Sequence, residues 1–427
     1  MSKFLYGIDF GTTNSALSIY DEDKQEIIST ITVPSLIYFH QEYIASQQNY
    51  VVGEQAIAAY LSDGMKGRFI KSIKQILSRT SFIETRIHNK RYNASDLVTL
   101  ILQDLKAKAD KITGYDCQKA VIGRPVFFDD DSASKDTLAQ TRLSKAAANA
   151  GFTEVRFQFE PIGAAFAYEK TIKKKEKVLV ADLGGGTTDF TYLILDPANA
   201  GNKDRKNDMI ASGGIYIGGD SFDSAFMWDK GTPYFGKNTL YEATPGKVLT
   251  VPISLFANIC SWDKMNFFNG LRIQKDLENY YHYSKQDRKF KNLLTLIDNN
   301  LGYSIFQQIE KTKIALSSQP TSKFTYSNMG IDINEDISRA QYDAVIEKDI
   351  KKISTYLDEF MLKNDIKAEE IDSLFLTGGT SLVGAIQNLF KTKFPHVSVN
   401  SGDNFESVAK GLAYSGYLFE ETVEAKG

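Results

Sequence analysis

Two stretches of this sequence decide its fold: GIDFGTTNSALSIY at residues 7–20 and VADLGGGTTDFTYLIL at residues 180–195. Each reads as an apolar strand with an aspartate, a glycine-containing turn with paired threonines, and a second apolar strand. This pattern is typical of a β-hairpin. Because the pattern occurs twice, it predicts two similarly folded halves that face each other across a cleft.

The chemistry of the two turns suits phosphate. Glycines let backbone N–H groups approach an anion closely, and consecutive N–H groups in such a turn form an anion-binding concavity. Two pairs of threonines add hydroxyl donors: Thr12, Thr13, Thr187 and Thr188. Three aspartates would repel a bare polyphosphate, which predicts a Mg²⁺ ion beside the phosphates. These are Asp9, Asp182 and Asp189.

Either turn alone could be an ordinary hairpin turn. The two copies, with acids at matching positions, instead indicate a pair of phosphate loops. No G-x-x-x-x-G-K-[ST] motif occurs in the chain. We therefore expect hairpins to hold the phosphates, and not the helix N-terminus of a P-loop.

Composition narrows the class of protein without identifying it. The chain has 427 residues, which suits two or three domains, and its 50 Lys and Arg nearly balance 53 Asp and Glu. This balance gives no electrostatic reason to expect a nucleic acid or a membrane as partner. Cys117, Cys260 and four scattered histidines predict neither a disulfide framework nor a Cys/His metal cluster. The chain shows no signal peptide and no long apolar run, so we expect a cytoplasmic protein.

Strand and helix signals alternate along the rest of the chain. Residues 95–109 place apolar side chains on one helix face, and Ser338 and Gln341 have the spacing of a capping box. The other expected elements are strands at 4–9, 15–20, 119–123, 154–159, 177–183, 373–377 and 397–400, and helices at 132–150, 380–393 and 406–420. The alternation predicts an α/β fold with sheets covered on both faces.

Two further glycine turns follow. FLTGGTSLVGAI (375–386) predicts a strand, the turn Gly378-Gly379 and a helix, against which a planar base or sugar can lie. IYIGGDSFD (215–223) contains Gly218 and Gly219. Between them, three residues at spacings of three and four share one helix face: Glu310, Lys313 and Ser317. A solvated helix face is the alternative interpretation of this trio.

In this order and at these spacings, the segments resemble the actin-like ATPase superfamily, and specifically the nucleotide-binding domain of DnaK-type, seventy-kilodalton heat-shock chaperones. GIDFGTTNS and VADLGGGTTDF are similar to the family's two phosphate loops, and FLTGGTSLV to its last nucleotide loop. The other similar segments are FEPIGAAFAYE (159–169), IYIGGDSFD (215–223), EKTKIALSS (310–318) and KQILSR (74–79), which carries the family's active-site lysine. The resemblance covers about residues 3 to 420. VIGRPVFF (121–128) and GDNFESVAKGLA (402–413) look most like the YegD-type subgroup of bacterial chaperone-like proteins.

This resemblance implies the duplicated ribonuclease-H-like fold of actin-like ATPases, with two lobes around a nucleotide cleft. We expect lobe I at residues 1–175, joined by a C-terminal helix at 396–420, and lobe II at 176–395. An aromatic-rich stretch at about 226–306 either fills the core of a subdomain or exposes an interface. Conventional members continue into a peptide-binding domain, but only YLFEETVEAKG follows Gly416, so we expect none here.

The resemblance also implies roles for individual residues. The catalytic residues would be Lys74, Glu160, Asp182 and Thr187. Lys74 would stabilise charge on the transferred phosphate, while Glu160 and Asp182 would orient the attacking water. Asp9, Asp182 and Asp189 would surround the Mg²⁺ ion. The nucleotide would contact Gly11, Thr12, Thr13, Gly184, Gly185, Gly186, Thr188, Gly218, Gly219, Glu310, Lys313, Ser317, Gly378, Gly379 and Thr380.

Two positions depart from the family pattern. The family arginine that stacks on adenine after the Gly-Gly turn is Leu382 here, and another frequent arginine on the adenosine-contacting helix is Ile314. Apolar contacts would replace a guanidinium stack worth about 0.5–2 kcal/mol. We therefore expect nucleotide binding that is weaker or less selective for adenine.

Together these expectations give one functional prediction: Mg²⁺-dependent ATP binding and slow ATP hydrolysis, which changes lobe closure, in a chaperone-like protein. The expected partners are ATP or ADP, J-domain proteins and exchange factors, and the expected state is a monomer. Three alternatives stay open: a filament-forming actin or MreB relative, a small-molecule kinase of the same superfamily, and a non-hydrolysing nucleotide sensor.

Overall fold

The computed structural model describes residues 3–44, 48–64, 66–129, 132–169, 172–199, 206–397, 399–400 and 406–419. The chain divides into two compact units. The first comprises Met1–Tyr216, Tyr356–Ser381 and Phe390–Gly427, and the second comprises Ile217–Thr355 and Leu382–Leu389. The lobes predicted at residues 1–175 and 176–395 stay a prediction.

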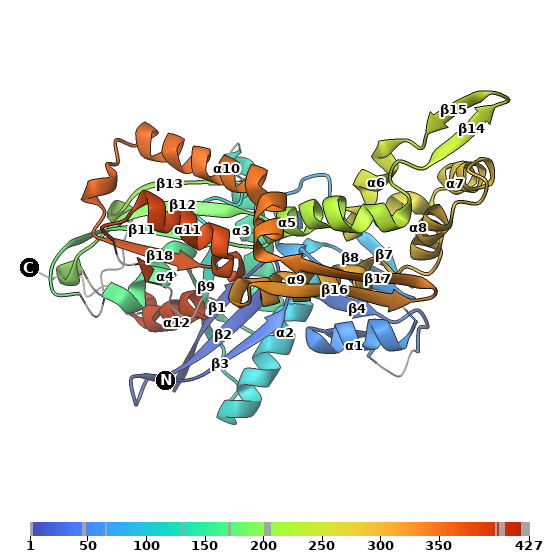
Figure 1. The fold of residues 1–427 in the computed structure, drawn as a ribbon. Coiled ribbons are helices and arrows are strands. Elements are labelled where there is room, and N and C mark those ends of the chain that lie inside the picture. Colours follow the sequence, from blue (N-terminus) through green and yellow to red (C-terminus); the bar gives the residue numbers. More distant parts are fainter. Residues whose placement is uncertain are drawn as a thin grey trace, which may run out of the picture. The chain divides into compact units, whose positions relative to one another are not determined.

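Two five-stranded sheets of the same topology lie in the first unit (Figure 1). The strand orders are β10-β9-β1-β2-β3 and β13-β12-β11-β18-β19. The first sheet contains β1 (Phe4–Phe10), β2 (Asn14–Asp21), β3 (Glu26–Pro34), β9 (Lys119–Arg124) and β10 (Glu154–Phe159). The second contains β11 (Glu176–Leu183), β12 (Thr188–Leu195), β13 (Met209–Ile215), β18 (Ser373–Thr377) and β19 (Val399–Asn400).

Each sheet has the quoted hairpin at its centre. β1 pairs antiparallel with β2 and parallel with β9, and β11 pairs antiparallel with β12 and parallel with β18. The duplicated α/β fold expected from the repeated sequence is therefore confirmed.

Helices cover both faces of the first sheet, which explains why β1 is apolar along nearly its whole length. Tyr6 and Ile8 pack with residues of α2 (Ala94–Thr113) and α3 (Ala133–Asn149). Leu5 instead packs in a cluster with residues of α4 (Glu160–Glu169) and α12 (Ser407–Ala413). Alternate side chains of one strand thus enter two different cores.

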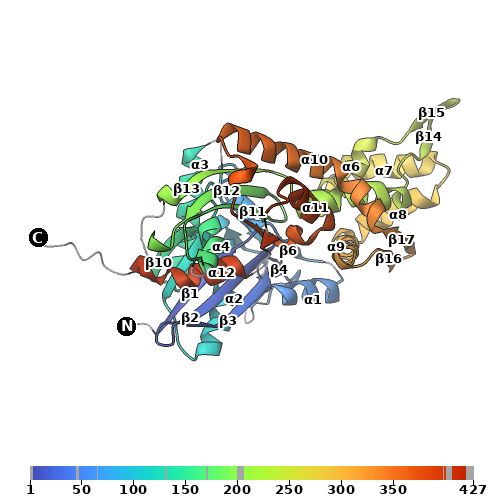
Figure 2. The same cartoon turned by 60° about the vertical axis from the view of Figure 1, so that its left-hand side comes forward.

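The helices α4 and α12 lie side by side, and α12 packs against β1 (Figure 2). Their contact depends on two glycines. A Cβ atom added at Gly411 would lie 1.7 Å from the carbonyl oxygen of Gly163, which no side chain could tolerate. The expected helix at 406–420 is shorter in the structure, because the 3₁₀ helix η9 (Tyr414–Phe419) follows α12.

Local signals set several helix ends correctly. The expected capping box precedes α10 (Arg339–Lys363): the backbone N–H of Ser338 donates to Oε1 of Gln341 at 2.8 Å, and the N–H of Gln341 donates to Oγ of Ser338 at 3.2 Å. The expected helix at 380–393 is divided into the 3₁₀ helix η8 (Gly379–Leu382) and α11 (Gly384–Lys393).

The remaining elements are divided between the two units. In the first unit they include β4 (Ile37–Phe39), β5 (Tyr50–Val52), α1 (Glu54–Ser62), β6 (Arg68–Ile70), η1 (Ile73–Ile76), β7 (Thr85–Ile87) and β8 (Lys90–Tyr92). In the second they include α5 (Gly219–Phe226), β14 (Leu240–Thr244), β15 (Lys247–Thr250), α6 (Ile253–Ile259), α7 (Leu271–Tyr283), α8 (Arg288–Asp298), α9 (Gly302–Ser318), β16 (Thr321–Asn328) and β17 (Ile331–Ser338).

Many aromatic residues of the 226–306 stretch fill the core of the second unit. Those with fully buried side chains are Phe226, Phe235, Phe256, Phe268 and Phe290. Phe267, by contrast, is 51% exposed. None of the described helices is both long and apolar enough to cross a membrane.

Candidate functional site

A cavity of about 480 Å³ lies at the turns of the two central hairpins. Its lining residues all belong to the first unit. The predicted site residues among them are Asp9, Gly11, Thr12, Thr13, Lys74, Glu160, Asp182, Gly184, Gly185, Gly186, Thr187, Asp189, Gly378 and Gly379. The structure thus brings both glycine-rich turns, the lysine segment and the last glycine turn to one place.

The first glycine-rich turn is held in shape by Ser35, which sequence reasoning missed. The hydroxyl of Ser35 donates to the carbonyl oxygen of Gly11 at 2.8 Å, and its backbone N–H donates to that of Thr13 at 2.8 Å. Its hydroxyl also lies 2.8 Å from that of Ser15. Ser35 follows β3, so only the folded sheet brings it beside the turn.

The second turn is closed by its own backbone and supported from the last glycine turn. The N–H of Gly184 donates to the carbonyl oxygen of Thr187 at 3.0 Å. The hydroxyl of Thr380 donates to the carbonyl oxygen of Gly184 at 2.8 Å. Gly378 has φ +79°, and a Cβ there would lie 2.3 Å from the carbonyl oxygen of Leu183. Thr380 therefore supports the loop, and, like buried Thr188, it is not among the residues that line the cavity.

Lys74 and Glu160 form an ion pair at the side of the cavity. The Lys74 ammonium donates to Oε1 of Glu160 at 2.7 Å. Burial by itself lowers the pKa of Lys74, but the charges of Glu160 and Asp9 outweigh burial and raise it. Lys74 thus stays a cation in a site that contains several carboxylates.

The three aspartates are buried near other carboxylates, and both burial and these charges raise their pKa values. Burial, followed by the charge of Glu160, raises the pKa of Asp9 to about 8 and that of Asp182 to about 6. Burial, followed by the charge of Asp182, raises the pKa of Asp189 to about 7. The hydroxyl of Thr187 donates to Oδ2 of Asp189 at 2.8 Å and works in the opposite direction. The ammonium of Lys74 is thus not enough to keep all three carboxyls in their charged form at neutral pH.

This donor set fits a Mg²⁺ ion that arrives with phosphate. Magnesium prefers oxygen ligands, keeps several waters, and binds proteins through one or two carboxylates. In the part of the chain that the structure describes, no three His, Cys, Asp or Glu side chains are grouped closely enough to hold a metal ion by themselves. Asp9, Asp182 and Asp189 are the residues that would contact such an ion or its waters.

Several lining residues were missed by sequence reasoning. Gln75 follows Lys74 directly, and its Nε2 atom would lie 2.7 Å from a Cβ atom added at Gly186. Phe127 and Tyr216 also line the cavity, although they are 53% and 73% exposed. Gln75 lies in KQILSR, Phe127 in VIGRPVFF and Tyr216 in IYIGGDSFD. The quoted motifs therefore contain all three residues, although no role was predicted for them.

The loop that carries Phe127 is held by Arg124 at the end of β9. The guanidinium of Arg124 donates to both carboxylate oxygens of Asp136 at 2.8 Å, and the backbone N–H of Phe128 donates to Oδ1 of Asp136 at 2.7 Å. Arg124 also donates to Gln140. These bonds fix the path of residues 124–128, and hence one wall of the cavity.

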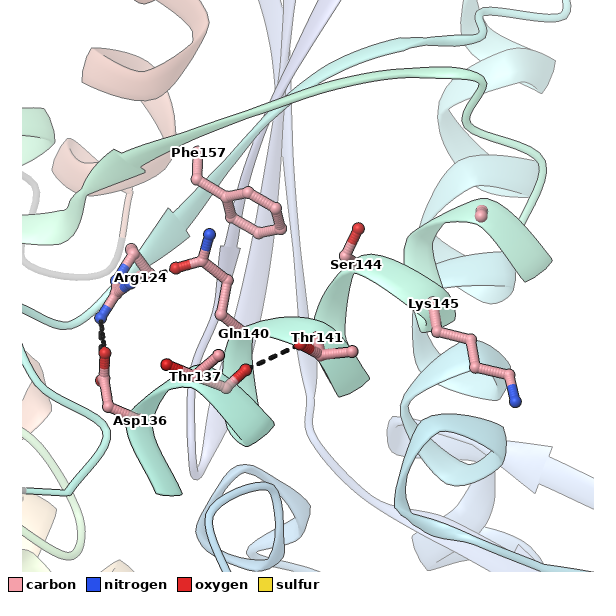
Figure 3. A pocket seen from close by; sticks show the side chains of 9 residues that line it. Arg124, Asp136, Thr137, Gln140, Thr141, Ser144, Lys145 and Phe157 are labelled. Atoms are coloured by element: carbon pink, nitrogen blue, oxygen red, sulfur yellow. Dashed lines mark hydrogen bonds and ion pairs between the residues drawn. The ribbon is translucent and has the colours of Figure 1, made fainter. Parts of the chain in front are cut away.

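A second cavity, of about 630 Å³, is lined by Arg124, Asp136 and further residues of α3. Figure 3 shows Arg124 and Asp136 joined at one end of it, Phe157 above Gln140, and Lys145 at the far end of the row on α3. The lining of this cavity contains none of the residues predicted from the glycine-rich motifs.

The other predicted residues belong to the second unit. Glu310, Lys313 and Ser317 lie on α9, as their spacing predicted. Lys313 forms an ion pair with Asp223 of the IYIGGDSFD segment, with 2.8 Å between Nζ and Oδ1. Gly218 precedes α5, whose first residue is Gly219. The motifs at 215–223 and 310–318 are therefore joined in one unit.

Ile314 and Leu382, which replace family arginines, are also in the second unit. Their side chains are 62% and 41% exposed, respectively. Each therefore presents apolar surface to its surroundings.

The sequence is similar to known proteins along most of its length. The family model described as Hsp70 protein matches residues 5–230 and 278–426. The chaperone protein DnaK of Mycoplasmopsis pulmonis (strain UAB CTIP) is 26% identical over 429 residues, which cover 97% of this chain and 58% of that protein. The chaperone protein DnaK of Thermosipho melanesiensis is 26% identical over 444 residues, covering 100% of this chain and 61% of that protein. The chain thus spans about three fifths of the length of these relatives.

Proposed function

This chain belongs to the Hsp70 family, and from that premise we propose that it binds ATP and ADP with Mg²⁺ and hydrolyses ATP slowly as part of a chaperone-like protein. One observation carries the proposal. Two glycine-rich turns from sheets of the same topology line a single cavity together with Lys74 and three aspartates. That combination supplies anion-binding N–H groups, a fixed cation and oxygen donors for a metal.

The two turns would hold the phosphates from opposite sides. Gly11, Gly185 and Gly186 line the cavity and would present backbone N–H groups to the phosphates, and Thr12 and Thr13 would add hydroxyl donors. The N–H of Gly184 and the hydroxyl of Thr187 already donate within the second turn. Bound Mg²⁺ would neutralise charge on the phosphates and on the aspartates. Because Ser35 and Thr380 hold the turns in place, little reorganisation would accompany binding.

Hydrolysis would use the ion pair and its neighbours. Lys74 would stabilise the negative charge that develops on the γ-phosphate. Glu160 and Asp182 would orient a water molecule. Its oxygen forms a bond to the γ-phosphorus as the bond to the bridging oxygen breaks, ADP leaves with the bonding electrons, and a carboxylate takes the proton of the water. Few groups assist this step, so we expect it to be slow.

The second unit would contribute to the nucleoside. Glu310, Lys313 and Ser317 share a face of α9, and the ion pair of Lys313 with Asp223 fixes the lysine there. Contact with ribose and adenine is the role the family pattern assigns to these positions. J-domain proteins and nucleotide exchange factors are the partners that we propose with the family.

Calorimetric titration with ATP, ADP and GTP in the presence of Mg²⁺ tests the binding. Single-turnover hydrolysis by the wild type, Lys74→Ala and Asp182→Asn, with and without a J-domain protein, tests the chemistry. We expect measurable ATP and ADP binding and strongly reduced hydrolysis in both variants. A flat titration for every nucleotide would disprove the proposal, and wild-type turnover in both variants would disprove the assigned mechanism.

A further inference from the structure

A small third cavity, of about 30 Å³, is lined in part by three carboxylates, those of Glu160, Asp182 and Asp189. It shares five lining residues with the larger cavity: Pro125, Phe127, Glu160, Asp182 and Asp189. Its other lining residues are Val126, Pro161, Val180, Thr191, Ser212 and Gly213. The carboxylates that we assign to hydrolysis therefore border two spaces, a large one suited to the nucleotide and a small one beside it.

The register of the second sheet places the polar wall of this small cavity. Asp182 of β11 is paired with Asp189 of β12. One row further back on the same sheet face, Val180 is paired with Thr191, and Thr191 with Ser212 of β13. A row of hydroxyls thus stands directly behind the row of aspartates.

The two hydroxyls contact each other. Oγ1 of Thr191 lies 3.1 Å from Oγ of Ser212, and Thr191 is almost completely buried. Each hydroxyl can accept further hydrogen bonds, and each can turn its proton toward a neighbour. The two prolines in the lining, Pro125 and Pro161, bring no N–H group to the cavity. The polar atoms are thus gathered on the sheet side and at the carboxylates.

Size and lining match a single water molecule. A water needs roughly 10–15 Å³ of accessible space and two to four polar partners. The cavity provides the space, and its partners are the carboxylates and the hydroxyls of Thr191 and Ser212. A phosphate group is too large for it.

We propose that this cavity holds the water that attacks the γ-phosphate, and that Thr191 and Ser212 are the residues that position it. The inference rests on the hydrolysis proposed above and adds the source of the nucleophile. The hydroxyls would hold the water against Asp182, Asp189 and Glu160, where its oxygen can form the bond to phosphorus and its proton can pass to a carboxylate. Without them the water would be present but poorly oriented.

The test replaces each hydroxyl while keeping the shape of the side chain. Thr191→Val and Ser212→Ala each remove one of the two hydroxyls, and Thr191→Ser keeps a hydroxyl at position 191. Single-turnover hydrolysis of Mg-ATP, ATP affinity by calorimetry and the melting temperature are measured for each. We expect Thr191→Val to slow hydrolysis roughly 10- to 100-fold with ATP affinity unchanged, Ser212→Ala to act in the same direction, and Thr191→Ser to recover most of the rate.

The first sheet offers a matched control. Ser18 and Thr30 are also cross-strand partners, with 2.9 Å between their hydroxyl oxygens, and neither lines the three cavities described here. Thr30→Val should therefore leave hydrolysis unchanged. A wild-type hydrolysis rate in folded Thr191→Val overturns the water site. If Thr191→Val does not fold, a wild-type hydrolysis rate in folded Ser212→Ala overturns it. The water site is also overturned if hydrolysis is slowed as much in Thr30→Val as in Thr191→Val.

The outcomes also separate this inference from the proposed function. If the wild type binds Mg-ATP without hydrolysing it, the hydrolytic part of the proposed function fails and the water site fails with it. If the wild type hydrolyses ATP and Thr191→Val is equally fast, only the water site is overturned. Slower hydrolysis with unchanged affinity, recovered in Thr191→Ser, supports it.

Discussion

The ammonium of Lys74 lies 2.7 Å from the carboxylate of Glu160, a residue 86 positions further along the chain. Their side chains are only 16% and 7% exposed. Lys74 stands on the 3₁₀ helix η1, and Glu160 begins α4 directly after β10. The pair therefore joins two segments of the first unit at the wall of the cavity. Among the described residues that line this cavity, Lys74 is the cation that is held against its carboxylates by a hydrogen bond.

Removing this cation should destabilise the protein. Lys74→Ala leaves Glu160 and the aspartates without their buried positive partner, and breaking such a pair typically costs about 3–5 kcal/mol. Denaturant unfolding measures the loss. Lys108→Ala is the control: its ion pair with Asp104 has the same 2.7 Å separation but is more exposed, so its loss should cost less than about 1 kcal/mol. Equal losses in both variants would contradict the importance of burial.

Replacing Asp9 should stabilise the nucleotide-free protein. Burial, then the charge of Glu160, raises its pKa from 3.8 to about 8. A carboxyl whose pKa is raised by folding stabilises the folded state at low pH, and that stability is lost as the pH rises through about 4 to 8. The asparagine side chain in Asp9→Asn cannot ionise, so this variant does not lose stability in this way as the pH rises.

Thermal melting without Mg²⁺ or nucleotide checks this expectation. At about pH 8, Asp9→Asn should melt a few degrees above the wild type, and the gap should narrow at about pH 5. The same variant should bind Mg-ATP more weakly, because one of the expected metal contacts is gone. An Asn variant that melts below the wild type at the higher pH would show that Asp9 is not destabilising.

The crossing of α4 and α12 should not tolerate a methyl group. Gly411→Ala would bring a Cβ atom to 1.7 Å from the carbonyl oxygen of Gly163, so the helices must separate, at a cost of about 3 kcal/mol. Gly384→Ala in α11 is the matched control. The nearest atom to its new Cβ would be Cδ of Arg339 at 3.8 Å, and removing a helical glycine there should be neutral or stabilise by up to about 1 kcal/mol. Denaturant unfolding that gave both variants the same stability would refute the close crossing.

Restoring the family arginine should sharpen adenine selectivity. Leu382→Arg would return a guanidinium that can stack on the base, worth about 0.5–2 kcal/mol, or about a 2- to 30-fold tighter Kd for ATP relative to GTP. Competition calorimetry with the two nucleotides measures the ratio. Leu362→Arg places the same charge at a leucine that is 84% exposed in α10 and should leave the ratio unchanged. An unaltered ratio in Leu382→Arg would mean that position 382 does not contact the base.

Local sequence determined the elements and the composition of the turns. The hairpins at 7–20 and 180–195 could be predicted because strand patterning, glycines and acids are short-range signals. The capping box of Ser338 and Gln341 depends on one helical turn, and it too was predicted correctly. Family resemblance then indicated Lys74 and Glu160 as site residues, although each motif by itself says nothing about the distance between them.

Only the tertiary structure decided how these pieces support one another. Ser35 beside the first turn, the Arg124–Asp136 clamp behind Phe127, and Thr380 against Gly184 all join residues that are distant in the chain or carry no pattern of their own. The hydroxyl row of Thr191 and Ser212 depends on a cross-strand register that no local pattern specifies. Periodicity and turn chemistry act over a few residues, whereas hydrogen bonds between distant segments exist only after the sheets have formed and packed.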